Sequence, residues 1–178
     1  MIPDREECLR LMERYGMLRN IISHSLEVTR VALFLSAELN RRGQRIDLRL
    51  VEAASLLHDI SKTECLRTKE DHSRVGCRLL KEIGYEKVGG IVAQHVWLEG
   101  ERDPAAVSEE EVVNYADKRV RHDEIVSLDE RFQDLRNRYG KNDWSISYLE
   151  GLEKMILGIE NKIFMILKID PDDIQILV

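Results

Sequence analysis

Apolar residues recur three and four positions apart along most of this chain, which is the spacing of one face of an α-helix. The repeat predicts helices at about 4–16, 20–42, 47–61, 71–84, 85–97, 108–122, 128–139 and 145–168. The stretches at about 62–70 and 99–108 lack the repeat and indicate loops, and nowhere is the alternation of a strand sustained. We therefore predict an all-α protein, a bundle of about seven to eight helices without a sheet.

Capping residues support several of these helix starts. Asp47 precedes the third helix, Asp71 or Ser73 precedes the fourth, and Ser108 is followed by three glutamates. Such side chains accept hydrogen bonds from the free N–H groups of a first turn, and acidic residues there suit the helix dipole. Only three prolines and ten glycines interrupt the chain, which also favours long helices.

Several predicted helices carry an ionisable residue on their apolar face. These residues are His24, His58, His95 and Asp117, and Asp59 follows His58 directly. A buried carboxylate is costly without a partner, so Asp59 and Asp117 require a compensating charge. Imidazoles and carboxylates together suit a transition metal such as Fe, Mn, Co, Ni or Zn. A single inward histidine is more often an ordinary core residue, so the metal hypothesis depends on the helices converging.

Size and charge narrow the possible functions. A length of 178 residues fits one domain, 1–178, and a net charge of −6 argues against a nucleic-acid partner. Three dispersed cysteines form no disulfide framework, so we expect a reducing, cytoplasmic location. The N-terminus lacks the pattern of a signal peptide, and no apolar run is long enough for a membrane span.

The order of His24, then His58-Asp59, then Asp117 resembles the HD superfamily of metal-dependent phosphohydrolases, found in bacteria among others. The surroundings also match, in His24-Ser25 and in the run Ala-Ala-Ser-Leu-Leu-His-Asp-Ile-Ser-Lys at 53–62. The resemblance implies an all-helical fold in which these four residues bind a first metal. Asp59 would bridge the ions if there are two.

The resemblance covers about residues 20–122, and the predicted helices over 128–168 would complete the bundle. Some HD branches carry extra histidines in the intervals that here contain His72 and His95, and these branches hold two metals. We therefore predict one or, more in keeping with six ligands, two divalent transition metals, with Mg²⁺ as a further option. The alternatives to a role as metal ligand are an exposed helix-cap residue for His72 and a core histidine for His95.

A basic cluster follows Asp117 and consists of Lys118, Arg119, Arg121 and His122. Arginines can grip phosphate oxygens at two points, so we predict that this cluster binds the substrate phosphate. The alternative is that basic residues here complement the C-terminal end of a helix dipole. Lys62 lies one helical turn after Asp59, and the resemblance implies a role for it beside the metals. Its alternative is a solvated lysine.

Together these features predict a metal-dependent phosphohydrolase. Its substrate would be a phosphomonoester or phosphoanhydride, by preference a nucleotide, attacked by hydroxide that the metals generate, with Asp59 and Lys62 as catalytic residues. One alternative is a regulatory or adaptor module that binds a nucleotide without turnover. Another is a structural bundle whose histidines never meet. We expect a small-molecule partner, no nucleic acid and no membrane, and the broad apolar face of the last helix leaves a homodimer contact open.

Overall fold

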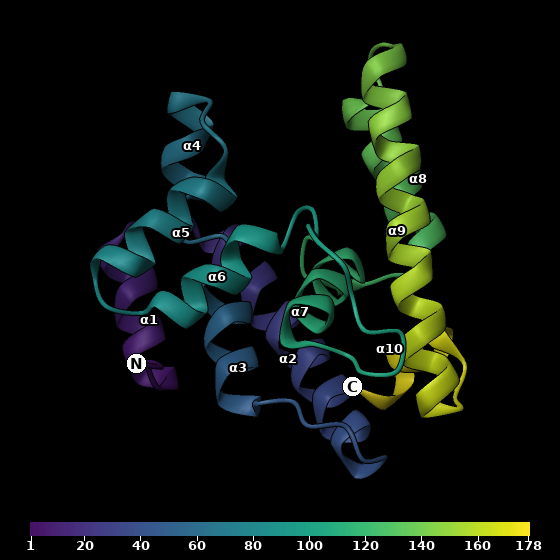
Figure 1. Ribbon diagram of the computed structural model, residues 1–178. Helices are drawn as coiled ribbons and strands as arrows, with labels where there is room; N and C mark the ends of the chain where they lie inside the picture. Colours follow the sequence, from purple (N-terminus) through teal and green to yellow (C-terminus); the bar gives the residue numbers. More distant parts are fainter.

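The all-α prediction is confirmed in the computed structural model, which describes residues 1–178 (Figure 1). Every predicted helix is present. The helices are α1 (Arg5–Arg14), α2 (Arg19–Arg41), α3 (Leu48–Leu57), α4 (Lys62–Thr68), α5 (His72–Glu82), α6 (Glu86–Gln94), α7 (Glu109–Lys118), α8 (Leu128–Tyr139), α9 (Asp143–Leu167) and α10 (Ile174–Leu177). A short 3₁₀ helix, Pro171–Asp173, precedes α10.

The predicted capping residues begin their helices. The Asp47 side chain accepts hydrogen bonds from the first backbone N–H groups of α3, and Asp71, rather than Ser73, does the same for α5. Ser108 and Glu111 form a reciprocal capping box at the start of α7. Since α7 carries Asp117, this cap sets where one of the candidate ligands lies.

Two predictions about local structure are wrong. The expected loop at 62–70 contains α4, and the chain has a small antiparallel hairpin of β1 (Val120–Arg121) and β2 (Glu124–Ile125). The helix α4 buries only Cys65, so it has no repeating apolar face for a pattern to reveal. Strands of two residues are likewise too short to alternate.

Three helices end earlier than the apolar repeat predicts. They stop at Leu57, Gln94 and Lys118, so that His58, His95 and Arg119 each occupy the first position after a helix. The free carbonyls of a last helical turn are available there as hydrogen-bond acceptors. This position governs how the two histidine rings are held, as described below.

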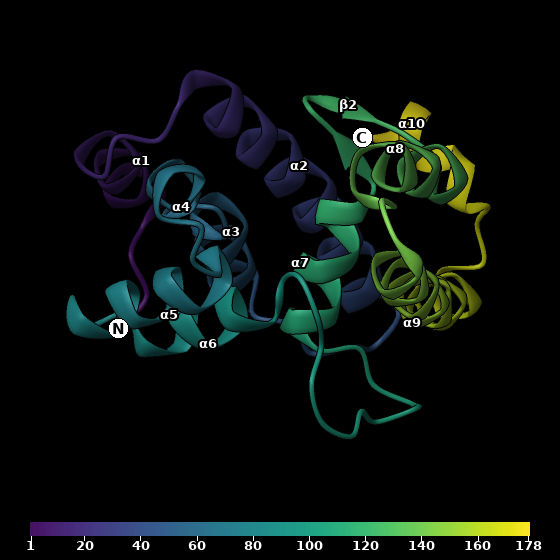
Figure 2. The same ribbon diagram turned by 90° about the horizontal axis from the view of Figure 1, so that it is seen from above.

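The long helix α2 and the shorter α7 lie side by side at the centre of the molecule (Figure 2). Helices α1 and α3–α6 pack on one side of them, and the antiparallel pair α8–α9 stands on the other (Figures 1 and 2). One continuous hydrophobic core joins the two sides, as expected for a single domain.

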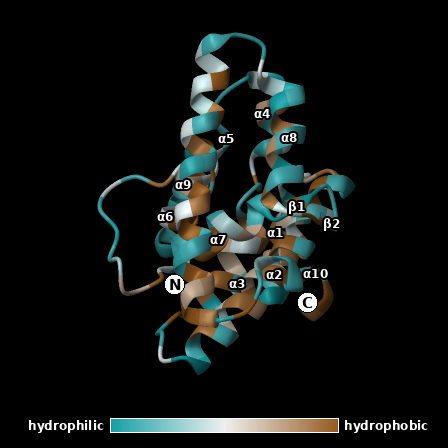
Figure 3. Ribbon diagram, turned by 90° about the vertical axis from the view of Figure 1, so that its right-hand side faces the viewer, coloured by the Kyte–Doolittle hydropathy of each residue, from teal (hydrophilic) through white to brown (hydrophobic).

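Helices α8 and α9 differ in how they contribute to this core. Along α9 an apolar stripe is buried, whereas α8 is mostly hydrophilic and buries only Leu128 and Phe132 (Figure 3). The outer part of the pair therefore stands above the body of the protein rather than within the core (Figure 1). None of the helices combines the length and the apolar character needed to cross a bilayer.

Candidate metal centre

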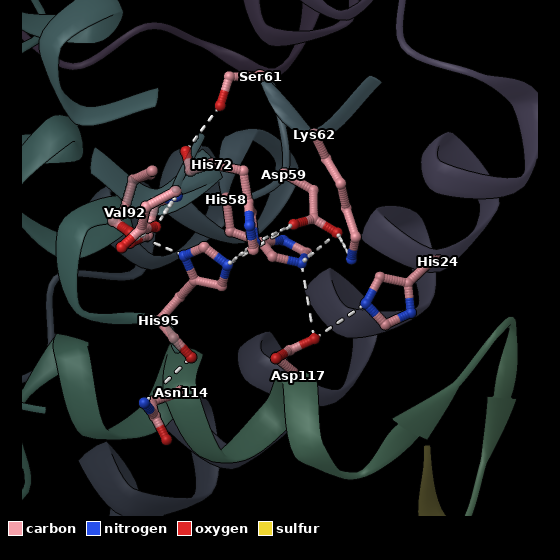
Figure 4. A network of polar contacts seen from close by, with 12 residues as sticks. His24, His58, Asp59, Ser61, Lys62, His72, Val92, His95, Asn114 and Asp117 are labelled. Carbon is pink, nitrogen blue, oxygen red and sulfur yellow. Dashed lines mark hydrogen bonds and ion pairs between the residues drawn. The ribbon is translucent and has the colours of Figure 1, made fainter. Parts of the chain in front are cut away.

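The structure brings all six predicted ligands together at one place (Figure 4). They come from α2, the turn after α3, the start of α5, the end of α6, and α7: His24, His58, Asp59, His72, His95 and Asp117. All are buried except His72, whose side chain is about a quarter exposed. The hypothesis of a bundle whose histidines never meet is therefore wrong.

Asp59 lies between two groups of histidines. Its Oδ1 is 3.2 Å from His72 Nε2 and 3.6 Å from His95 Nε2, and its Oδ2 is 3.4 Å from His58 Nε2. Potential ligand atoms within 4.8 Å of one another form two sets, His24 with His58 and Asp59, and Asp59 with His72 and His95. A carboxylate shared by two sets suits a bridge between two neighbouring cations.

Asp117 completes the set that contains His24. Its Oδ1 is 2.9 Å from His24 Nε2 and 3.7 Å from His58 Nε2. Figure 4 shows the two carboxylates, Asp59 and Asp117, facing one another, with His24 and Lys62 to one side. The arrangement therefore offers four nitrogen-bearing rings and two carboxylates to a shared space.

Backbone carbonyls fix the orientation of three of the histidine rings. His58 and His95 each donate from Nδ1 to the carbonyl three residues earlier, both at 2.7 Å. His24 donates from Nδ1 to the carbonyl of His122 at 2.8 Å. Because Nδ1 donates to a carbonyl in each case, Nε2 points into the shared space, and in the neutral ring Nε2 carries the lone pair with which a histidine ligates a metal.

Two atoms of the centre are buried without a hydrogen-bond partner, His58 Nε2 and Asp59 Oδ1. Leaving such an atom unpaired costs about 1–3 kcal/mol. Burial also lowers the pKa of His95 to about 4, so its imidazole is neutral at physiological pH and can bind a cation. Because a divalent cation would satisfy both unpaired atoms, the residues present fit a metal.

Two lysines compensate the charge of the carboxylates. Lys62 Nζ lies 2.6 Å from Asp59 Oδ2, and Lys118 Nζ contacts Asp117 Oδ2. Burial alone would raise the pKa of both carboxyls. The neighbouring His58 and Lys62 nevertheless hold the pKa of Asp59 well below its usual range, and Lys118 does so for Asp117. Both groups are therefore ionised, as ligands must be.

The structure places the Arg119 side chain away from the centre, which counts against its predicted phosphate contact. The side chain is fully buried, and its Nε donates to the carbonyl of Val126 at 2.7 Å. Its Nη1 donates to the Tyr115 hydroxyl at 2.7 Å and to the carbonyl of Pro171 at 2.9 Å. Because α7 ends at Lys118, the chain turns there, and Arg119 ties the hairpin and the C-terminal segment to α7 instead of facing the centre.

The other three basic residues after Asp117 lie in different surroundings. Lys118 is buried beside the centre, and the ring of His122 lines a cavity next to His24. Arg121 pairs with Glu124 at 3.3 Å across the hairpin and reaches neither cavity beside the centre, which counts against its predicted phosphate contact. Phosphate binding by Lys118 and His122 stays a prediction.

The centre opens on two neighbouring cavities. The larger, about 530 Å³, is bounded by the candidate ligands on one side and by α8 and α9 on the other. The smaller, about 210 Å³, lies beside His24 and His122 and extends to Arg138 of α8. Asp59, Lys62 and Arg131 line both cavities, so the two are parts of one substrate-sized space around the centre.

Arg131 is a functional candidate that the sequence analysis missed. Its side chain is 14% exposed, its Nη1 lies 3.4 Å from Asp134 Oδ2, and its Nε has no hydrogen-bond partner. A signal for it exists in the sequence, because Arg131 lies three residues after the buried Leu128 and four before Leu135, on the same face of α8. The criterion that identified His24, an ionisable residue on the apolar face of a helix, would have identified Arg131 too.

Comparison with known proteins agrees with this geometry. The HD domain family model matches residues 21–121, which is more than half of the chain. A tRNA (cytidine(56)-2'-O)-methyltransferase of Thermoplasma volcanium is 33% identical over 97 residues, 54% of this chain and 27% of that protein. No solved structure gives a significant match.

Two further relatives are named Ribonuclease Y. The protein of Acetivibrio thermocellus is 34% identical over 89 residues, 49% of this chain and 16% of its own. That of Desulforamulus reducens is 29% identical over 154 residues, 82% of this chain and 26% of its own. The chain thus spans only about a quarter or less of these relatives. With the family match and the converging ligands, the chain belongs to the HD domain family, within the superfamily of metal-dependent phosphohydrolases.

Proposed function

We propose that this protein hydrolyses a phosphomonoester or phosphoanhydride bond of a nucleotide with the help of one or, more in keeping with six ligands, two divalent cations. The observation that carries the proposal is the pair of ligand sets that share Asp59. This shared carboxylate lines a cavity that the Arg131 side chain also borders. A site for cations and a guanidinium side by side suit a phosphate group.

The residues of the chain have separate tasks in this proposal. The histidines and the two carboxylates hold the cations, which when bound supply Lewis acidity and lower the pKa of water. Arg131 has the planar donor set that matches two phosphate oxygens. Lys62, partly exposed beside Asp59, is placed to offset the charge that gathers on phosphate oxygens during cleavage. Lys118 keeps Asp117 ionised and oriented.

A second candidate is cleavage of a phosphodiester bond in RNA. It is favoured by the relatives named Ribonuclease Y. The net charge of −6 counts against it, because RNA binding is commonly driven by a basic surface. A module that binds a nucleotide without turnover is a third candidate, and the complete ligand set counts against a degenerate site.

Release of phosphate or nucleotide from a panel of substrates distinguishes these candidates. The panel contains nucleoside mono- and polyphosphates and a single-stranded RNA, each with Mn²⁺, Fe²⁺ or Co²⁺. We expect turnover of a nucleotide and a loss of at least about 1000-fold in kcat/KM for Asp59→Ala. The exposed Arg78, on the same helix as His72, provides a control, since Arg78→Ala should retain activity.

Two outcomes would contradict the proposal. Cleavage of RNA without turnover of any nucleotide would favour the nuclease. Tight nucleotide binding would favour the regulatory module if Mn²⁺, Fe²⁺ and Co²⁺ all failed to support turnover.

A further inference from the structure

Three aromatic rings form a row on the side of the larger cavity opposite the metal centre. Tyr148 lies between Trp97 and Trp144, with ring centroids 5.3 and 5.7 Å away. The rings of Trp144 and Tyr148 are within 16° of parallel, and both line the cavity. Trp97 is not part of the cavity lining and packs against α9 at Gly151, where a Cβ would lie 3.5 Å from the indole. Trp97 therefore supports Tyr148, and Trp144 and Tyr148 are the rings that line the cavity.

These rings are exposed to an extent that folding does not explain. Trp144 is 76% exposed and Tyr148 is 36% exposed, although both lie on α9, whose other apolar residues form part of the core. Exposed aromatic residues gathered at one cavity commonly mark a binding surface. The remaining apolar lining comes from Val96, Leu135, Tyr139, Leu149 and Leu152. This side of the cavity thus suits a flat, largely apolar group.

The same cavity is strongly polar on its other side. Asp59, His72, His95 and Asp117 line it there, and Arg131 also borders it. A ligand that fills the cavity must therefore have an anionic end and a planar end. Its volume of about 530 Å³ is that of a site for one small molecule, in the usual range of roughly 300–1,000 Å³. A nucleotide has both ends.

We propose that Trp144 and Tyr148 form a nucleobase-binding subsite for a free nucleotide whose phosphate faces the metal centre. The base stacks on the exposed indole of Trp144, which Tyr148 supports, and the guanidinium of Arg131, which borders the same cavity, binds the phosphate. This subsite rests on the proposed function and adds the residues that recognise the base of the nucleotide. The net charge of −6 favours a free nucleotide over the end of an RNA strand.

Binding can be tested without hydrolysis, because the chain has only two tryptophans. In Trp97→Phe, Trp144 is the sole tryptophan and reports directly on the subsite. With chelator present, adenosine 5′-monophosphate should quench its fluorescence in a saturable way, whereas ribose 5-phosphate, which lacks a base, should not. Equal quenching by both compounds, or by neither, would overturn the subsite.

Kinetics provide a second test with the metal-loaded enzyme. Trp144→Ala should raise KM for the adenine nucleotide by about 10-fold and leave KM for ribose 5-phosphate unchanged, because only the nucleotide loses a stacked base. Trp144→Phe should keep KM for the adenine nucleotide close to the wild-type value, because phenylalanine retains an aromatic ring. Ile146, exposed on the same turn of α9 and outside the cavity lining, provides the matched control, and Ile146→Ala should behave as wild type.

The outcomes separate this inference from the proposed function. If the enzyme hydrolyses nucleotides and Trp144→Ala leaves KM unchanged, the subsite is wrong and the proposed function stands. If the nucleotide quenches Trp144 but no substrate is hydrolysed, the subsite stands and the proposed activity is wrong. If a short oligoribonucleotide quenches at far lower concentration than the mononucleotide, the assignment to a free nucleotide is overturned.

Discussion

At the scale of single residues, Lys62, the first residue of α4, pairs its positive charge with the carboxylate of Asp59. Its ammonium group is 2.6 Å from Asp59 Oδ2, yet its side chain is 40% exposed and borders both cavities. Lys118 has the corresponding position beside Asp117 but is almost fully buried. Lys62 is therefore the more accessible of the two, whereas the Lys118 ammonium is held by Asp117 and by the carbonyl of His95.

Substitution of Lys62 should separate chemistry from metal binding. Lys62→Ala should lower kcat by about 10- to 100-fold, because the ammonium group beside the reacting phosphate is lost. The metal ligands themselves stay in place. Metal content measured on the same preparation should equal that of the wild type. Lys69→Ala, an exposed lysine at the end of α4, is the control. A Lys62→Ala enzyme that loses its metals would show that the lysine serves the centre itself.

A site residue can be predicted from the sequence when it interrupts the apolar face of a helix. His24 and Asp117 interrupt apolar faces, so their burial could be predicted, whereas their convergence was implied only by the resemblance to the HD superfamily. Arg119 was misinterpreted because a charged residue next to a ligand does not reveal which way its side chain turns after the helix ends. Arg131 could have been found by the same pattern, whereas the unpaired state of its Nε depends on tertiary contacts.

At the scale of elements, the packing of α5 against α6 positions two of the histidines. His72 begins α5 and His95 follows the end of α6, so the two Nε2 atoms come within 3.1 Å of one another. Gly89 permits this approach, since a Cβ there would lie 2.9 Å from the backbone oxygen of Cys77. A backbone atom cannot move aside without shifting a helix.

Adjacent glycines of α6 provide a matched pair of variants. Gly89→Ala should destabilise the protein by about 1–3 kcal/mol, because the added methyl group overpacks the α5–α6 contact. Gly90→Ala meets nothing within 4 Å and should be neutral or stabilising by up to about 1 kcal/mol, since alanine favours the helix. Urea denaturation of both variants measures the difference. Equal stability of the two would show that α5 and α6 do not pack this closely.

Elements were predictable in proportion to their length. Every helix with a repeating apolar face was anticipated, including α2 and α9. The seven-residue α4 and the two-residue strands of the hairpin were not, because neither repeats a pattern. The hairpin nevertheless matters to the site, since the carbonyl of His122 in its turn orients His24.

At the scale of the whole molecule, the α8–α9 pair closes one side of the site. The pair supplies Arg131, Trp144 and Tyr148, while the ligands all come from the part of the chain before it. The matched family region likewise ends at residue 121, before α8 begins. The candidate metal centre therefore belongs to the shared part of the fold, and we propose that the C-terminal pair recognises the substrate.

Metal content of the purified protein tests the central claim most directly. Protein prepared without a histidine tag or chelator should contain two transition-metal ions per chain by elemental analysis, and added metal should raise the melting temperature of chelated protein. Asp59→Ala should lose both ions, because this carboxylate belongs to both ligand sets. Wild-type protein without stoichiometric metal, and with no gain in melting temperature on adding Mn²⁺, Fe²⁺, Co²⁺, Ni²⁺ or Zn²⁺, would contradict the account.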